Sequence, residues 1–122
     1  MKEKSIISHQ VDGQTLLEVL SEEQIIGSVQ DALDLLGELF GRYYDGIILH
    51  EGSFNPRFFD LKTKFAGEIL QKFSNYRVRL AIVGDWSKYT SHSFAAFIVE
   101  SNRGRMVNFT TSTEEAVSLF QC

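Results

Sequence analysis

The side chains best suited to chemistry follow two short apolar runs of the sequence, GIILH at Gly46–His50 and RLAIVG at residues 79–84. If both runs are neighbouring parallel strands, their carboxyl ends lie at one edge of a sheet, where ligands usually bind. We therefore expect the loops after these strands to form a candidate ligand or partner site. Its residues are His50, Glu51, Ser53, Asp85, Trp86, Ser87 and Lys88.

These residue types do not assemble a recognisable catalytic constellation. Glu51 and Asp85 suit a carboxylate pair for acid–base work, or are loop acids, with Asp85 holding a turn. His50 and Ser53 supply a base and a hydroxyl, but no third member or oxyanion device accompanies them. The sequence therefore favours binding over catalysis, and we predict no catalytic residue.

No cofactor or metal site is expected either. The three histidines stand alone in the sequence, without HxxxH or CxxC spacing. Neither GxxxxGK[ST] nor GxGxxG occurs, so no phosphate loop is predicted.

Five arginines precede three of the expected strands, and parallel pairing would gather them at the opposite, amino edge of the sheet. Because arginine forks suit carboxylates and phosphates, this set is a candidate anion or acidic-partner patch. Salt bridges to Asp31, Asp45, Glu100 or the helix ends are the alternative use. The five are Arg42, Arg77, Arg79, Arg103 and Arg105.

The loop WSKYTSH, residues 86–92, holds the only tryptophan together with Tyr89 and His92. It has no apolar period. An exposed aromatic loop of this kind is a contact surface, or alternatively its rings fold back as a lid on the core.

Hydrophobic periodicity and turn signals place the elements that would position these residues. Asp12-Gly13 predicts a type I′ turn between two strands. Ser28 caps a helix whose apolar stripe runs from Val29 to Phe40, and Gly41 closes it. The remaining elements are the strand Gly46–His50, a helical segment opened by Asn55-Pro56 that restarts at Thr63, the strand 79–84, a helix at 93–101, a strand at 106–110 and a helix opened by the capping box Ser112-x-x-Glu115.

This order, ββαβαβαβα, predicts one α/β domain over residues 1–122. Its sheet is mostly parallel, with about five strands, an edge hairpin at the amino end and about four helices. Right-handed crossovers that all step the same way place their helices on one face. The strands are apolar on both faces, so we expect a partner, a second copy or a split of the helices to cover the other face.

Composition narrows the class of protein. The 122 residues carry a net charge of −4, which argues against nucleic acid. No apolar run approaches the length of about 20 residues that crosses a membrane. The single cysteine, Cys122, has no internal partner, which favours a reducing, cytoplasmic setting.

The segment FFDLKTKFAGEILQKFSNYRVRLAIVGD, residues 58–85, followed by ESNRGR, residues 100–105, resembles a bacterial domain family of unknown function. The resemblance covers most of the chain and implies a fold without an activity. The element order also resembles the STAS domain (sulfate-transporter and anti-sigma-factor-antagonist type), a regulatory binding module. STAS antagonists carry a phosphorylatable serine at the start of a helix after a central strand. Ser53 is the nearest match, although it precedes Asn55-Pro56 and lacks the Asp-Ser pattern.

The function that we expect is a cytoplasmic regulatory or protein-interaction module that acts through a protein partner or by self-association. One alternative is a small-molecule or anion-binding protein that uses the loops at the carboxyl ends of the strands. A small hydrolase or transferase is the other.

Overall fold

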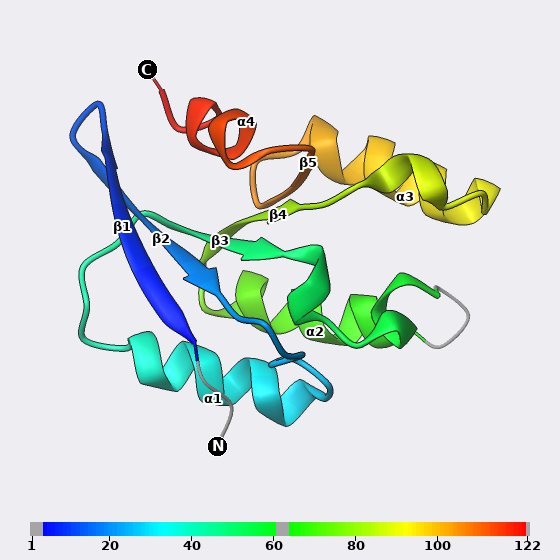
Figure 1. Ribbon diagram of the computed structural model, residues 1–122, viewed down its shortest axis with the longest axis horizontal. Helices are drawn as coiled ribbons and strands as arrows, with labels where there is room; N and C mark the ends of the chain where they lie inside the picture. Colours follow the sequence, from blue (N-terminus) through cyan, green and yellow to red (C-terminus); the bar gives the residue numbers. More distant parts are fainter. Residues whose placement is uncertain (1–3, 61–63, 122) are drawn as a thin grey trace.

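Five strands form one sheet in the same order as they occur along the chain (Figure 1). A computed structural model describes residues 4–60 and 64–121. Strand β1 is antiparallel to β2, and all later neighbours are parallel. The strands and helices are β1 (Ser5–Val11), β2 (Gln14–Leu20), α1 (Val29–Leu39), β3 (Gly46–His50), α2 (Phe65–Asn75), β4 (Arg79–Val83), α3 (His92–Arg103), β5 (Val107–Thr110) and α4 (Thr113–Ser118). The predicted α/β fold class and element order are confirmed.

The hairpin of β1 and β2 turns where the sequence predicts. Asp12 and Gly13 have φ angles of 47° and 79°, and a type I′ turn requires positive φ at both positions. Val11 then pairs with Gln14, and the register continues to Ser5 opposite Leu20. The turn therefore fixes which residues of β1 face which residues of β2.

Helices α1, α2 and α3 pack on one face of the sheet because each crossover steps to the next strand in the same direction. The main core lies between these three helices and the sheet. Its sheet side includes Leu17, Ile47 and Ile82, and its helix side includes Ile69 and Phe94, all buried. The predicted inward positions of α3, Phe94, Phe97 and Ile98, belong to this core.

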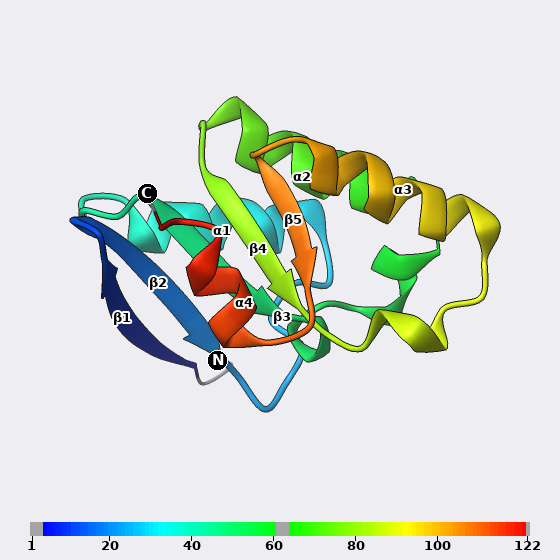
Figure 2. The ribbon, with the colours of Figure 1, turned by 90° about the horizontal axis from the view of Figure 1, so that it is seen from above.

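Helix α4 covers the opposite face, so the helices are split between the two faces. Figure 2 shows α4 in front of the strands and α1 behind them. Ala116 and Phe120 pack there on a second, smaller apolar group of Leu16, Ile48 and Ala81. Gly46 leaves the space that Phe120 fills, since a Cβ at that position would lie 2.5 Å from the ring.

The edge strand β5 is protected by the side chain of Asn102, which belongs to the segment ESNRGR at residues 100–105. The Oδ1 of Asn102 accepts a hydrogen bond from the Phe109 amide at 2.7 Å, and its Nδ2 donates to the Phe109 carbonyl at 3.3 Å. An open strand edge is a template for pairing with another chain. Asn102 occupies the amide and the carbonyl of Phe109, so these two groups cannot pair with another strand.

Some predicted boundaries differ from the structure. Phe40 was expected in the apolar stripe of α1, but it is 88% exposed. The helix ends at Leu39, and the extended backbone of Phe40 turns its side chain away from the stripe. Asn55-Pro56 opens the short 3-10 helix Pro56–Phe59. The predicted helix restart at Thr63 and the terminal Cys122 lie outside the described residues.

Replacing Gly46 with alanine should destabilise the fold by about 1–3 kcal/mol, because the new methyl group would displace Phe120 from its place against the sheet. Gly37→Ala in α1 is the control. That position has open space around it, and alanine should stabilise the helix by about 0.5–1 kcal/mol. Chemical denaturation measures both changes. A neutral Gly46→Ala would show that Phe120 is not held against β3.

Candidate functional site

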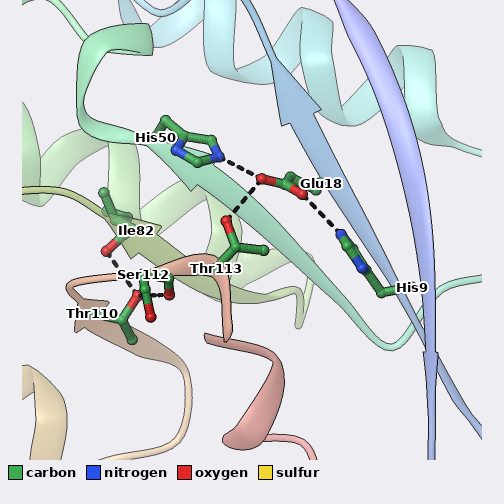
Figure 3. A network of polar contacts seen from close by, with 7 residues as sticks. All are labelled: His9, Glu18, His50, Ile82, Thr110, Ser112 and Thr113. Atoms are coloured by element: carbon green, nitrogen blue, oxygen red, sulfur yellow. Dashed lines mark hydrogen bonds and ion pairs between the residues drawn. The ribbon is translucent and has the colours of Figure 1, made fainter. Parts of the chain in front are cut away.

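A buried carboxylate lies at the centre of a cluster of polar side chains on the second face of the sheet. Glu18 of β2 is 5% exposed and faces α4. Its Oε1 lies 2.8 Å from Nε2 of His9, and its Oε2 lies 2.6 Å from Nε2 of His50 (Figure 3). The hydroxyl of Thr113, the first residue of α4, donates to Oε2 at 3.0 Å. Glu18 therefore links β2 to β1, β3 and α4.

Strand register explains how these groups meet. Glu18 pairs with Ile7 of β1 and with Ile48 of β3. His9 and His50 each lie two residues further along those strands, so they share the face of Glu18 and are its diagonal neighbours. Diagonal neighbours on one face are within reach of long side chains, and here both reach the same carboxylate.

The surroundings of Glu18 favour its charged form. Burial alone would raise the pKa of this carboxyl, but hydrogen bonds from His50, His9 and Thr113 together lower it below its ordinary value. An ionised carboxylate only accepts hydrogen bonds, so both histidines must donate from Nε2. The side chains of His9 and His50 are 29% and 30% exposed. The Nδ1 atom of each ring takes no part in the contact with Glu18.

The two histidines stand apart in the sequence but come together through Glu18. They nevertheless do not build a metal centre. Figure 3 shows the rings on opposite sides of the carboxylate, so their nitrogens do not converge on one point. Among residues 4–60 and 64–121, no group of three or more potential metal ligands is arranged to hold an ion.

A second carboxylate, Glu51, ties together the two loops predicted as a site. Its Oε1 accepts from the Asp85 amide at 3.1 Å, while Oε2 contacts the Lys88 ammonium at 2.7 Å and the Tyr89 hydroxyl. Burial raises the pKa of Glu51, and these three donors together lower it below the ordinary value. Gly84 permits the approach, since a Cβ there would lie 2.7 Å from Glu51.

The other predicted loop residues also have structural partners. Asp85 accepts from the amide and hydroxyl of Ser87, at 3.2 and 2.6 Å, which is the turn-holding role. Trp86 donates from Nε1 to the Thr110 carbonyl at 2.7 Å and packs against Phe59 and Phe109. The aromatic loop thus folds back on the core.

Ser53 lies in the interior. It is 0% exposed, and its hydroxyl has no hydrogen-bond partner among the described residues. Its carbonyl accepts from the amides of Ile25 and Ile26, both at 2.9 Å, which joins the segment before α1 to the loop after β3. A modifying enzyme could not reach this hydroxyl in the folded protein.

The five arginines at the amino edge fall into three groups. Arg103 pairs with Glu100 at 3.1 Å. Arg79 donates from Nε to the Arg105 carbonyl at 2.7 Å and lies over the Phe120 ring at 4.0 Å. Arg42 and Arg77 line a pocket together with aromatic residues.

The amino-edge pocket has a volume of about 320 Å³. It lies between the loop that joins α1 to β3 and the turn that joins α2 to β4. Phe40, Tyr43 and Tyr76 are 88%, 74% and 62% exposed. The lining residues are Leu39, Phe40, Gly41, Arg42, Tyr43, Tyr44, Asp45, Tyr76, Arg77 and Val78.

Comparison with known proteins gives the family. The description "Domain of unknown function (DUF4180)" matches residues 11–119. The chain belongs to this family. No curated protein and no solved structure matches this family member significantly. In the described part of the chain, none of the helices has the length and apolar character needed to cross a membrane.

Sequence reasoning about this family member missed Glu18, His9 and Thr113, and the three exposed aromatics of the amino edge. A signal for the first group was available. The Asp12-Gly13 turn fixes the hairpin register, and this register places His9 diagonally across from Glu18. Thr113 comes from 95 residues away in the chain, and no local pattern indicates it.

Glu18→Gln should lower the free energy of unfolding at neutral pH by about 3 kcal/mol. The NH2 group of glutamine would face a histidine N–H in a buried site, so two donors would meet and one hydrogen bond would be lost. Thr113→Val should cost about 1 kcal/mol, since it removes one of the three donors. Urea titration measures both.

The cost of Glu18→Gln should also depend on pH. Because the pKa of Glu18 is lower in the folded state, its charge stabilises the fold above the unfolded value of 4.5, and this stabilisation is lost as the pH falls through the folded value. The difference in free energy of unfolding between the parent protein and Glu18→Gln should therefore become smaller in acid. A gap that stays constant from pH 7 to pH 3 would contradict an ionised Glu18.

Proposed function

We propose that this chain is a cytoplasmic protein-interaction module of a bacterial cell, and that the amino-edge pocket binds an acidic segment of a partner protein. One observation carries the proposal: three exposed aromatic side chains surround a pocket that also presents two arginines. A regulatory role for the module rests on the resemblance of its element order to the STAS domain.

The aromatic side chains support protein binding. Phe40, Tyr43 and Tyr76 leave much of their surface in water, which is unfavourable unless a partner covers it. Tyrosine and arginine are among the residues that contribute most to binding at protein interfaces. The pocket brings both types together.

The charge of the pocket supports an acidic partner. Arg42 and Arg77 are exposed, and within the described residues neither forms an ion pair with a carboxylate. The acid of the pocket lining, Asp45, is already engaged by the Thr15 amide at 2.8 Å. Both guanidinium groups are therefore available to carboxylates of a partner, on a protein whose net charge is −4.

The backbone of Arg77 supports a role for its side chain. Its φ angle is 57°, in the left-handed region that glycine adopts most easily. A non-glycine residue costs about 1–2 kcal/mol there. An arginine at this position of the α2 to β4 turn is less favourable for stability than a glycine, which supports a binding role for its guanidinium group.

The carboxyl-edge loops support this choice by contrast. Glu51, Asp85 and Trp86 are engaged with Lys88, Ser87 and the Thr110 carbonyl. A ligand at that edge would have to displace these contacts. At the amino edge, a ligand of Arg42 and Arg77 would not have to displace an ion pair with any described residue.

A peptide of alternating glutamate and phenylalanine is the probe for this function. In an NMR titration it should shift amide signals at residues 39–45 and 76–78. A matched peptide with glutamine in place of glutamate should bind at least tenfold more weakly, because it lacks the charge-assisted hydrogen bonds. Shifts confined to the loops after β3 and β4, or equal binding of the two peptides, would contradict the proposal.

Arg77→Gly should separate stability from binding. It should raise the free energy of unfolding by about 1 kcal/mol, because glycine adopts the left-handed backbone conformation without the cost that arginine has. It should also weaken binding of the acidic peptide at least tenfold. Arg103→Gln removes the same charge outside the pocket and should leave peptide affinity within about twofold of the parent protein. A destabilised Arg77→Gly variant, or one that retains full affinity, would refute the assignment.

A further inference from the structure

A second basic feature at the amino edge is the pair formed by Arg79 and Arg105, which is not part of the pocket lining. Arg79 is the first residue of β4, and its side chain is held at two points. Nε donates to the Arg105 carbonyl at 2.7 Å, and the guanidinium carbon lies 4.0 Å from the centre of the Phe120 ring. These contacts use Nε and one face of the guanidinium, and leave its terminal nitrogens for another acceptor.

The Arg79 side chain lies directly against the backbone of Arg105, through the bond from its Nε to the Arg105 carbonyl. Partial burial and the charge of Arg105 both lower the pKa of the Arg79 guanidinium. Within residues 4–60 and 64–121, neither arginine forms an ion pair with an acidic side chain. In contrast, Arg103 nearby in the sequence has Glu100 as its partner. Two arginines that are in contact with each other thus have no acidic side chain as a partner in the described part of the chain.

We propose that Arg79 and Arg105 bind a tetrahedral oxyanion of the phosphate class, as free phosphate or as the phosphoryl group of a monoester. A doubly charged oxyanion matches two guanidinium groups in charge, and its oxygens suit the donor geometry of arginine. Binding would place a negative charge beside two arginines that have no acidic side chain as a partner among the described residues. The immobilised Arg79 would lose little side-chain freedom when it binds the ligand.

The site is connected to α4 through Phe120. Arg79 covers the ring that anchors the end of α4 over Gly46. An oxyanion that holds Arg79 in place would therefore also stabilise the packing of α4 on the second face. This gives binding a structural readout that does not depend on the amino-edge pocket or on a protein partner.

The experiment is an NMR titration at pH 7.5 that follows the Nε–H signal of Arg79 and the amides of β4 and α4. Inorganic phosphate and O-phosphoserine are the two ligands, and sodium chloride at matched ionic strength is the reference. Both signal sets should shift saturably. Arg105→Gln should weaken binding at least tenfold, whereas Arg103→Gln, with the same charge change, should stay within about twofold of the parent protein.

Thermal unfolding provides the second measurement. At a phosphate concentration about ten times Kd, the midpoint should rise by about 5 °C in the parent protein and in Arg103→Gln. The rise should largely disappear in Arg105→Gln, which separates site binding from the general stabilising effect of phosphate.

The two ligands distinguish the source of the oxyanion. Binding of both supports recognition of the phosphoryl group itself, and binding of one alone assigns the site to free phosphate or to a monoester. The proposal is overturned if neither ligand shifts Arg79 saturably, or if Arg105→Gln and Arg103→Gln respond alike.

Discussion

The rest of the second sheet face depends on one constraint, the buried charge of Glu18. A carboxylate removed from water costs several kcal/mol unless hydrogen-bond donors surround it. Glu18 obtains them from three separate elements: His9 of β1, His50 of β3 and Thr113 of α4. A one-residue slip of β1 along β2 would move His9 to the opposite face, away from Glu18. The charge therefore reinforces the register that the Asp12-Gly13 turn sets, and it favours the place where α4 begins.

Helix α4 shows why this constraint matters. With six residues it is too short to be stable alone. Two contacts position it: Thr113 binds Glu18 at its start, and Phe120 fills the space above Gly46 just beyond its end. At the carboxyl edge, Glu51 connects the neighbouring loops in a similar way. The side chains at this edge thus stabilise the fold, whereas the amino edge exposes Phe40, Tyr43 and Tyr76 beside Arg42 and Arg77.

The sequence predicts most of the fold but less of the site. Apolar periodicity and caps such as Ser28 locate the elements, because these signals are local. Phe40 was misplaced because periodicity alone does not show that the helix ends at Leu39. The sequence identifies His50 and Glu51 as polar residues at a strand end but not their partners. His50 meets Glu18 through strand register, and Glu51 meets Lys88 of a loop that follows another strand. The sequence groups five arginines at strand starts, but only side-chain packing separates Arg42 and Arg77, which line the pocket, from the paired Arg103.

The most direct test of the central role of Glu18 is the tautomeric state of His9 and His50, read from long-range nitrogen–proton NMR correlations at neutral pH. An ionised Glu18 that accepts from both rings requires a proton on Nε2 of each. We predict that both histidines show a protonated Nε2, and that the Nε2 protons exchange slowly with water. An unprotonated Nε2 on either ring would contradict the account, because Glu18 would then have to carry the proton and the buried charge would not exist.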